Sequence, residues 1–278
     1  IDNLLLLSAK EEYLMFYNGF KKVPLPSIWV NNPRINVIDK SYPNKILDMS
    51  SRFIGIPNVE NFTGKGRLVF SPHFNILKTK LPHIVTFHDL SFLHHPNFFS
   101  NKQKVWHWLQ GFRNTAKNAT HCIAVSEFTK NDLVDLLGIP EEKISVIYSG
   151  INSSFRVLKK DSAELLDYKM KNKLTKPFIL YLGTLEPRKN IPALIRAFDK
   201  LKSDSNFSDF ELVLAGKIGW LSKELFREIE RTHHASSIRF IGSPTSEDRV
   251  FLYNLAEIFA YPSFFEGFGF QPLEAQAC

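Results

Sequence analysis

The sequence FILYLGTLEPRKNIPALIRAFDKL, residues 178–201, joins a buried type of strand to an amphipathic helix. Residues 178–182 are all apolar, Gly183 ends the run, and a polar loop leads to Asn190. Apolar residues then recur at helical spacing, at Ile191, Leu194, Ile195, Phe198 and Leu201. This order predicts one strand–loop–helix unit of an α/β protein.

The same alternation extends along the chain and predicts parallel sheets covered by helices. Further strands are expected at residues 68–71, 84–87, 122–125, 144–147, 212–215, 238–241 and 258–261. One amphipathic helix is expected over Lys104 to Asn118, and another from an N-cap at Ser126 to Leu137 before Gly138. A polar, lysine-rich linker, residues 151–176, would separate an N-terminal domain, 1–150, from a C-terminal domain, 177–278.

The loop after the strand at 178–182 carries Arg188 and Lys189 directly before a helix. Asn190 is placed to cap that helix, whose electropositive end and two cations favour an anion such as a diphosphate. The alternative is an exposed basic loop without a ligand.

A second loop, PSFFEGFGFQPLE at residues 262–274, places Glu266 and Glu274 on either side of Gly267, Phe268 and Gly269. It follows an apolar run, and Pro272 stands where a helix is expected to begin. The glycines allow a ligand to approach the backbone, and both carboxylates accept hydrogen bonds from hydroxyls, as in a sugar and a ribose. Alternatively, Glu274 only complements a helix dipole and Glu266 is a solvated loop charge.

Composition restricts the class of protein. The chain has 278 residues, 44% hydrophobic and 23% charged, which suits two globular domains. Two cysteines, Cys122 and Cys278, argue for a reducing compartment, so a cytoplasmic protein is expected. The net charge of +7 favours anionic partners, namely nucleic acid, an anionic membrane face or a nucleotide diphosphate. The sequence has no zinc-finger spacing and no RNA-binding aromatic motif, which argues against nucleic acid.

Several absent motifs narrow the chemistry. The sequence contains no Asp-x-Asp, a short acidic motif that can hold a metal on a bound diphosphate, so we expect protein cations rather than a metal to meet the charge of a diphosphate ligand. It also lacks Gly-x-Gly-x-x-Gly and the P-loop motif, which disfavours a dehydrogenase and a P-loop NTPase. The pairs His94-His95 and His233-His234 are expected to be surface residues rather than metal ligands.

The loop at 262–274 resembles the Glu-x7-Glu signature of retaining glycosyltransferases of family 4, which have the GT-B architecture of two Rossmann-like domains facing a cleft. Residues 183–190 resemble the donor-phosphate segment of that family, and residues 216–220, Gly-Lys-Ile-Gly-Trp, resemble a further family segment. The resemblance implies that Glu274 binds ribose, that Glu266 binds sugar hydroxyls and that the leaving diphosphate meets two cations. The implied donor-binding residues are Gly183, Arg188, Lys189, Gly216, Lys217, Glu266, Gly267, Phe268, Gly269, Phe270 and Glu274.

Two of these residues keep an alternative. Gly216 and Lys217 lie at the carboxyl end of a predicted strand, where they either contact a nucleotide or form a purely structural turn. Trp220 is expected to pack rather than to stack on a ligand.

The N-terminal domain supplies one implied catalytic residue. His88 follows the strand at 84–87, and Thr86-Phe87-His88-Asp89 is similar to the Thr-x-His-Asp segment of the family, which implies a hydrogen bond from His88 to the transferred sugar. Asp89 is expected to orient the local backbone. His73 resembles, more weakly, a residue of an acceptor-side loop. The predicted catalytic set is His88, Glu266, Arg188 and Lys189.

The motifs and the family resemblance together imply a retaining, metal-independent glycosyltransferase without a cofactor, which moves a hexose from a nucleotide sugar to a glycan or lipid-linked acceptor. Mannose from GDP-mannose is the first expectation for the donor, and the resemblance implies a front-face route in which the leaving phosphate accepts the proton of the acceptor hydroxyl. The alternatives are a UDP-sugar-dependent enzyme of the same fold, a nucleotide-sugar-binding module without turnover, and a basic nucleic-acid-binding protein. The chain reads as truncated at both ends, and peripheral contact with the inner membrane face stays open.

Overall fold

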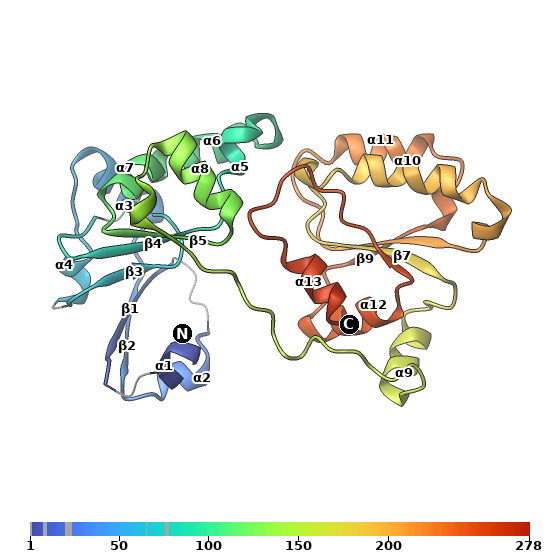
Figure 1. Cartoon of the computed structure of the whole chain (residues 1–278), viewed down its shortest axis with the longest axis horizontal. Coiled ribbons are helices and arrows are strands. Elements are labelled where there is room, and N and C mark those ends of the chain that lie inside the picture. The colour runs from blue at the N-terminus through green and yellow to red at the C-terminus, as the bar shows by residue number, and fades with distance from the viewer. Residues whose placement is uncertain (1, 8–9, 20–23, 65, 76–77) are drawn as a thin grey trace. The chain divides into compact units, whose positions relative to one another are not determined.

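The computed structural model describes residues 2–7, 10–19, 24–64, 66–75 and 78–278. These form two compact units, one of residues 1–88 with 105–147 and one of residues 89–104 with 148–278. Each unit is described separately below (Figure 1). The domain boundaries expected at residues 150 and 176 stay a prediction.

The N-terminal unit contains a parallel four-stranded sheet in the order β3-β4-β5-β6 and a separate parallel pair, β1-β2. Its strands are β1 (Tyr13–Asn18), β2 (Ile35–Lys40), β3 (Val69–Ser71), β4 (His83–Phe87), β5 (His121–Ala124) and β6 (Ile144–Val146). Its helices are α1 (Asp2–Leu7), α2 (Ser27–Val30), α3 (Asn44–Phe53), α4 (Glu60–Thr63), α7 (Phe112–Asn118), α8 (Glu127–Leu137) and the 3-10 turn η2 (Glu141–Lys143). The strands expected at 68–71, 84–87, 122–125 and 144–147 are confirmed to within two residues.

The C-terminal unit contains one parallel sheet in the order β10-β7-β8-β9. Its strands are β7 (Phe178–Leu182), β8 (Glu211–Ala215), β9 (Ile238–Gly242) and β10 (Ile258–Phe259). Its helices are α5 (Ser91–His94), α9 (Ala163–Lys171), α10 (Ile191–Lys202), α11 (Lys223–Arg231), α12 (Ser246–Leu255) and α13 (Phe270–Gln276). Its short 3-10 turns are η1 (Pro96–Phe98), η3 (Pro187–Lys189), η4 (Ser205–Phe207) and η5 (Ala235–Ser237). Helix α6 (Asn101–Gln110) begins in this unit and continues into the N-terminal unit from residue 105.

Alternating side chains of β7 and β8 supply both halves of the core. Ile179 and Tyr181 pack with α10 and α11, whereas Phe178, Leu180 and Leu182 pack with residues of α9 and α12. Since successive side chains of a strand point to opposite faces, a fully apolar strand must be covered on both. Figure 1 shows α10 and α11 on one face of this sheet and α9, α12 and α13 on the other.

Two glycines allow the loops after β7 and β8 to touch. A Cβ on Gly216 would lie 1.9 Å from the carbonyl oxygen of Gly183, and both residues have φ angles that favour glycine, +148° and +149°. Beyond them Leu185 donates its backbone N–H to Lys217, and Gly219 donates to Leu185. The loop that carries Arg188 is therefore braced by the segment 216–219.

Several local predictions are confirmed. Ser126 Oγ accepts a hydrogen bond from the backbone N–H of Thr129, and Gly138 ends α8 in the left-handed conformation. The helix expected after residue 190 is α10, with Ile191, Leu194, Ile195 and Phe198 buried. The ring of Trp220 stacks on that of Phe99 at 6.3 Å, and its Nε1 donates to the carbonyl of Phe98 at 2.6 Å, so Trp220 packs within the protein.

Other predictions are wrong in detail. The single helix expected over 104–118 is two helices, α6 and α7, because Gly111 between them has φ of 62° in the left-handed region. Helix α9 lies inside the segment expected to be a linker. It buries Leu165 and Tyr168, and Tyr168 belongs to the core of the C-terminal unit. Helix α13 begins two residues before Pro272, at Phe270.

Candidate active site

The two loops singled out in the sequence meet at one end of the C-terminal sheet. Strand β10 pairs in parallel with β7, so the segments that follow them emerge side by side. The backbone N–H of Phe264 donates to the carbonyl of Arg188 at 2.9 Å, and Asn190 Nδ2 donates to the carbonyl of Pro262 at 3.2 Å. Asn190 occupies the N-cap position in a left-handed conformation but makes no capping bond with its side chain, so the predicted cap is wrong. It ties the loops together instead.

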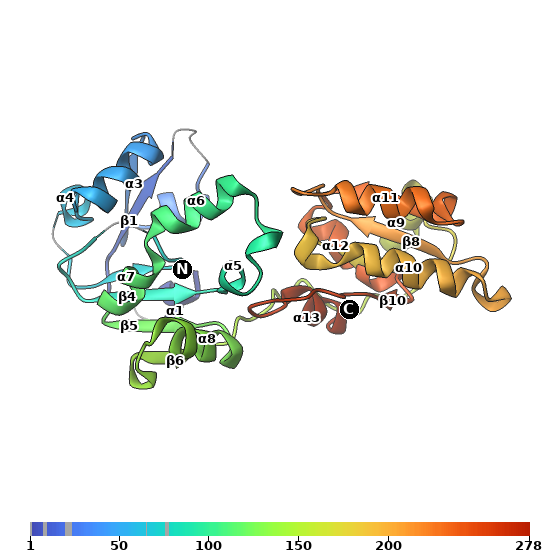
Figure 2. The same ribbon diagram turned by 90° about the horizontal axis from the view of Figure 1, so that it is seen from above.

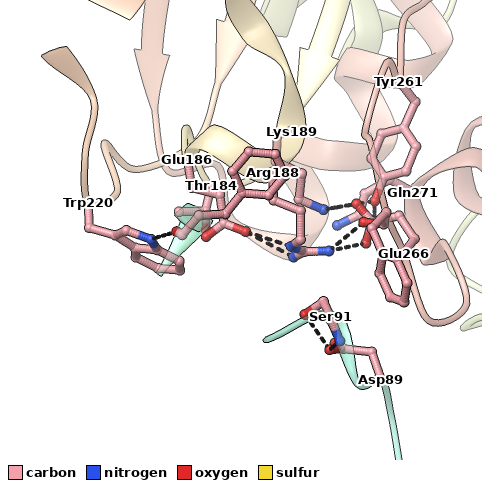
Figure 3. A network of polar contacts seen from close by, with 12 residues as sticks. Asp89, Ser91, Thr184, Glu186, Arg188, Lys189, Trp220, Tyr261, Glu266 and Gln271 are labelled. Carbon is pink, nitrogen blue, oxygen red and sulfur yellow. Dashed lines mark hydrogen bonds and ion pairs between the residues drawn. The ribbon is translucent and has the colours of Figure 1, made fainter. Parts of the chain in front are cut away.

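Four charged side chains form the centre of the site, and we call Glu186, Arg188, Lys189 and Glu266 the charge cluster. Arg188 Nη1 donates to Glu266 Oε2 at 2.8 Å, and Lys189 Nζ donates to Glu266 Oε1 at 2.5 Å (Figure 3). Nε and Nη2 of Arg188 both donate to Glu186 Oε1, at 3.1 and 2.9 Å. Two carboxylates and two cations thus neutralise one another.

The cluster is largely shielded from solvent. The side chains of Glu186 and Lys189 are only 5% and 6% exposed, and those of Arg188 and Glu266 are 16% and 21% exposed. Buried charges need partners, and removal of one partner from such a pair costs about 3–5 kcal/mol. The cluster is therefore a strongly coupled unit rather than a set of solvated surface charges.

Burial and ion pairing act in opposite directions on the acids. Burial would raise the pKa of Glu266, but Lys189 and Arg188 outweigh it and the pKa is lowered. For Glu186 burial dominates, and its pKa is raised despite the attraction of Arg188. The deeper carboxylate is thus the one that holds a proton more readily.

The cations differ as well. Burial alone would lower the pKa of Arg188, yet Glu266 and Glu186 together raise it. Burial lowers the pKa of Lys189, and Glu266 only partly offsets this effect. Glu266 is therefore the shared counter-ion on which both cations depend.

Both cations keep hydrogen-bonding capacity for a ligand. A guanidinium has five N–H donors, and Arg188 makes four bonds, one of them from Nη1 to the carbonyl of Phe265. Lys189 uses two of its three donors, on Glu266 and on the hydroxyl of Tyr261 at 3.0 Å. Each cation thus has one N–H that makes no hydrogen bond to another described residue.

Tyr261 and Gln271 form a hydrogen-bonded chain that leads to Lys189 of the charge cluster. The Tyr261 hydroxyl accepts from Lys189 and donates to Gln271 Oε1 at 2.9 Å, and the ammonium of Lys189 lies 5.0 Å from the centre of the Tyr261 ring. Burial, together with the nearby Glu266 carboxylate, raises the pKa of the Tyr261 hydroxyl. It therefore stays neutral and orients Lys189.

Glu274 lies on α13 and is held separately. Its Oε2 accepts hydrogen bonds from Tyr253 at 2.9 Å and from Arg249, both on α12. It lies in the second turn of α13 and not in the first, because the helix starts at Phe270. The side chain is buried and fixed, with its second oxygen not used in any bond between described residues. That geometry argues against a solvated helix-end charge.

The glycine-rich turn between the two glutamates contains one constrained position. Gly269 has φ of 88° and stands directly before α13, so a residue with a Cβ would be strained there. The rings of Phe268 and Phe270 lie 5.3 Å apart. The predicted contacts of Gly267, Phe268, Gly269 and Phe270 with a sugar stay predictions.

The segment 216–219 has a structural role in this geometry. The backbone N–H of Gly216 donates to the carbonyl of Gly242, and the carbonyl of Lys217 accepts from Leu185. Gly183 likewise donates its N–H to Ala215. Their backbone groups support the loop of Arg188, while the Lys217 side chain is exposed; nucleotide contacts of Gly183, Gly216 and Lys217 stay predictions.

Residues 89–104 pack on the C-terminal unit although they follow β4 in sequence. The ring of Phe98 stacks on Phe264 at 5.4 Å, and the rings of His94 and His95 lie 4.9 and 6.0 Å from Phe265. His95 is thus partly buried in aromatic packing rather than a plain surface residue. No group of three metal-type ligands occurs among the described residues.

Asp89 belongs to the same segment and behaves as expected. Its Oδ1 accepts from the backbone N–H of Ser91 at 2.9 Å and from the Ser91 hydroxyl (Figure 3). Its negative charge also favours the protonated form of Arg188 and so adds to the rise in that pKa.

His88 and His73, which we call the histidine pair, lie in the N-terminal unit after β4 and β3. Their rings are 5.8 Å apart and both are exposed. His88 Nε2 is 2.8 Å from the carbonyl of Pro72, and His73 Nδ1 is 2.8 Å from the carbonyl of Phe74. Because a carbonyl only accepts, each of these nitrogens carries the proton, and the other nitrogen of a neutral ring is an acceptor. Neutral His88 would thus accept from a sugar hydroxyl, whereas the sequence prediction has it donate.

The structure brings together Arg188, Lys189 and Glu266 as predicted partners of one site, and His88 belongs to the other unit. The supporting residues missed by the sequence prediction are Glu186, Arg249, Tyr253, Tyr261 and Gln271. Only Glu186 left a usable signal, since it is a carboxylate two residues before Arg188 in the predicted phosphate loop.

Comparison with known proteins identifies the family. Residues 67–155 match the family described as Glycosyltransferase Family 4, and residues 164–278 match Glycosyl transferases group 1. O-antigen chain mannosyltransferase B of Escherichia coli is 32% identical over 204 residues, which cover 71% of this chain and 52% of that protein. O-antigen chain mannosyltransferase RfbU of Salmonella typhimurium is 27% identical over 77% of this chain and 54% of its own length. The chain thus spans about half the length of these curated relatives.

Solved structures show the fold. Sucrose-phosphate synthase from Thermosynechococcus elongatus matches with a TM-score of 0.69 at 17% identity, over 98% of this chain and 71% of that one. HepE from Anabaena, in complex with UDP and glucose, matches with a TM-score of 0.62 at 17% identity, over 88% and 65%. With parallel sheets in both units, these neighbours assign the GT-B fold. The chain belongs to the glycosyltransferases, with an N-terminal segment of family 4 and a C-terminal segment of group 1.

Proposed function

We propose that the protein transfers a hexose from a nucleotide diphosphate sugar to an acceptor hydroxyl with retention of anomeric configuration. The observation that carries the proposal is the charge cluster, in which one carboxylate, Glu266, bridges Arg188 and Lys189 at the carboxyl end of the C-terminal sheet. Family membership supports the class of reaction.

The cluster suits the charges of the reaction. Departure of a nucleoside diphosphate places negative charge on the leaving oxygen, and fixed cations in a shielded site stabilise it without reorganisation. The spare N–H donors of Arg188 and Lys189 are the groups we assign to the diphosphate. We assign Glu266 to the sugar hydroxyls, because its oxygens are held in place by both cations. Because protein cations fill this role, we propose that the reaction needs neither a metal nor a cofactor.

The donor is proposed to be GDP-mannose. The supporting evidence is that relatives at 32% identity are named mannosyltransferases. Glu274, fixed by Tyr253 and Arg249, is assigned to the ribose hydroxyls. Since every nucleotide carries a ribose, this contact does not select the base. UDP-glucose or another donor of the same class is the competing assignment.

The acceptor is proposed to be a glycan or a lipid-linked glycan, as the names of the O-antigen relatives suggest. Among the described residues, no helix has the length and apolar character needed to cross a bilayer. A lipid-linked acceptor would bring the protein to the inner membrane face as a peripheral protein.

Calorimetric titration of the protein with GDP, UDP and GDP-mannose, with and without EDTA, tests the donor site. We expect GDP-mannose binding that survives EDTA and is lost in Arg188→Ala. Arg196→Ala is the matched control, since Arg196 is exposed and pairs with Glu228 away from the cluster. Binding that is equal in Arg188→Ala and wild type would reject the donor site.

The proposed retention of anomeric configuration is tested by a separate measurement. Proton NMR of the transfer product should show the anomeric configuration of the donor sugar. Inverted configuration would reject the front-face route, and donor binding without any transfer would support a binding module instead.

A further inference from the structure

Helix α3 carries apolar side chains on two sides. Leu47 and Ser51 face inward and are buried. Ile46, Met49 and Phe53, at spacings of three and four residues, form a second stripe, and they are 66%, 53% and 66% exposed. A helix that only covers a core has polar residues on its outer face, so this outer apolar stripe has another cause.

Helix α6 extends this outer surface. Trp108 is 55% exposed and Val105 61% exposed, and the rings of Phe53 and Trp108 lie 6.4 Å apart. Gln110 Nε2 donates to Asp48 Oδ2 at 3.0 Å, which fastens α6 to α3. Figure 2 shows the two helices along the same side of the N-terminal unit. We call the exposed surface of Ile46, Met49, Phe53, Val105 and Trp108 the α3–α6 face.

Cations border the α3–α6 face. Lys45 and Arg52 lie next to the stripe on α3, and the guanidinium of Arg52 is 5.0 Å from the centre of the Trp108 ring. Lys102 and Lys104, both exposed, precede Val105 on α6. Asp48 is the only acid in the two helices, and it bonds to Gln110. The face is therefore apolar and aromatic with a positive margin.

We propose that the α3–α6 face docks on an anionic phospholipid bilayer. Tryptophan and phenylalanine partition to the boundary between headgroups and acyl chains, and lysine and arginine are attracted to anionic headgroups. An amphipathic surface of this composition lies in the plane of the membrane. A second copy of the chain fits less well, because two identical positive margins would repel each other.

The inference rests on the proposed function in one respect, since a lipid-linked acceptor gives the protein a reason to reach the membrane. Its test is independent of the donor site. Sedimentation with vesicles of 70% phosphatidylcholine and 30% phosphatidylglycerol measures the bound fraction of the protein. We expect binding that falls at least fivefold on pure phosphatidylcholine vesicles and at least threefold when salt rises from 0.1 to 0.5 M.

Variants locate the surface. Met49→Ser with Phe53→Ser should reduce the bound fraction at least fivefold, and Lys45→Gln with Arg52→Gln at least threefold. Val157→Ser with Met170→Ser is the matched control, since both residues are exposed and apolar but lie in the C-terminal unit. Circular dichroism and GDP-mannose titration should be unchanged in the Met49/Phe53 variant, which separates a failure of docking from a failure of the donor site.

Three results would overturn the proposal. The first is no binding to anionic vesicles, and the second is a bound fraction as high in the Met49/Phe53 variant as in wild type. The third is a dimer in analytical ultracentrifugation that this variant abolishes, which would assign the face to a second copy of the chain.

Discussion

The charge cluster and the histidine pair carry the two sets of predicted catalytic residues, and they are built in opposite ways. In the cluster every charged group is shielded and contacts another charged group at 3.1 Å or less. In the histidine pair both rings are exposed, and each is tied by one nitrogen to a backbone carbonyl. A shielded, coupled set is preorganised and intolerant of change, whereas exposed rings acquire their surroundings from a ligand.

The largest expected effect that tests this contrast is that of Glu266→Gln. The amide leaves Arg188 and Lys189 without their shared counter-ion, so we expect a loss of about 3 kcal/mol in the free energy of unfolding and of about 10²–10³ in kcat/KM. Urea denaturation and a transfer assay measure these quantities. Glu228→Gln, which removes an ion pair that is open to solvent on the arginine side, should cost less than about 1 kcal/mol. Equal costs for the two variants would show that the cluster is not coupled.

The support beneath the cluster gives the next effect. Gly216→Ala would place a Cβ against the Gly183 carbonyl at a φ of +148°, and we expect about 3 kcal/mol of destabilisation. Thermal unfolding measures it. Gly150→Ala is the control, because nothing lies within 4 Å of the position that its added methyl group would take. A variant that keeps wild-type stability but loses nucleotide binding would instead favour the predicted nucleotide contact of Gly216.

Glu186→Gln separates positioning from binding within the cluster. The amide still accepts a hydrogen bond but no longer attracts Arg188 as an ion, so the guanidinium is held less firmly. We expect kcat to fall about tenfold while the dissociation constant of GDP-mannose changes less than about threefold. Glu211→Gln, which alters a partly buried pair with Arg239, is the control. A large loss of donor affinity with unchanged kcat would contradict a positioning role.

His88→Ala examines the other side of the comparison. Alanine has neither the donor nor the acceptor nitrogen of the ring, so kcat should fall about fivefold to tenfold, the worth of one neutral hydrogen bond, while the unfolding free energy should change by no more than about 1 kcal/mol because the ring is exposed. His121→Ala, at a histidine bonded to Ser145, is the control for the assay. A loss as large as that of Glu266→Gln would remove the contrast between the two regions.

The sequence predicts the elements that short-range patterns determine. The apolar run 178–182, the capping pair Ser126 and Gly138, and the stripe of α10 are local features, and all appear in the structure. The apolar periodicity does not reveal the break at Gly111, because a single glycine can also occur inside a continuous helix. Helix α9 escapes prediction because its buried residues, Leu165 and Tyr168, are few within a charged sequence.

The site divides in the same way. Arg188, Lys189, Glu266 and Glu274 are visible as motifs, but the bonds that join Glu266 to the two cations connect residues more than 70 positions apart. Nothing local indicates that Asn190 bonds to Pro262 rather than to its own helix, or that Glu274 is held by Arg249 and Tyr253. The partners of Glu266 and Asn190 depend on the parallel pairing of β10 with β7, and those of Glu274 on the packing of α13 against α12, which only the tertiary structure supplies.

The smallest expected effect is a pH dependence, and it distinguishes the two acids of the cluster. The pKa of Glu266 is lowered because Lys189 and Arg188 outweigh the effect of burial, so its contribution to stability is complete above the pKa of the unfolded chain, about 4.3, and is lost as pH falls through the lower folded value. Burial raises the pKa of Glu186, so its ionisation costs stability as pH rises through that raised value. The stability difference between wild type and Glu266→Gln should therefore stay constant from about pH 7 to about 4.5 and shrink below it, whereas that for Glu186→Gln should already change above about pH 4.5. Urea denaturation at half-unit pH steps measures both curves, and a Glu266 difference that collapses between about pH 7 and 5 would mean that the cluster does not hold this carboxylate ionised.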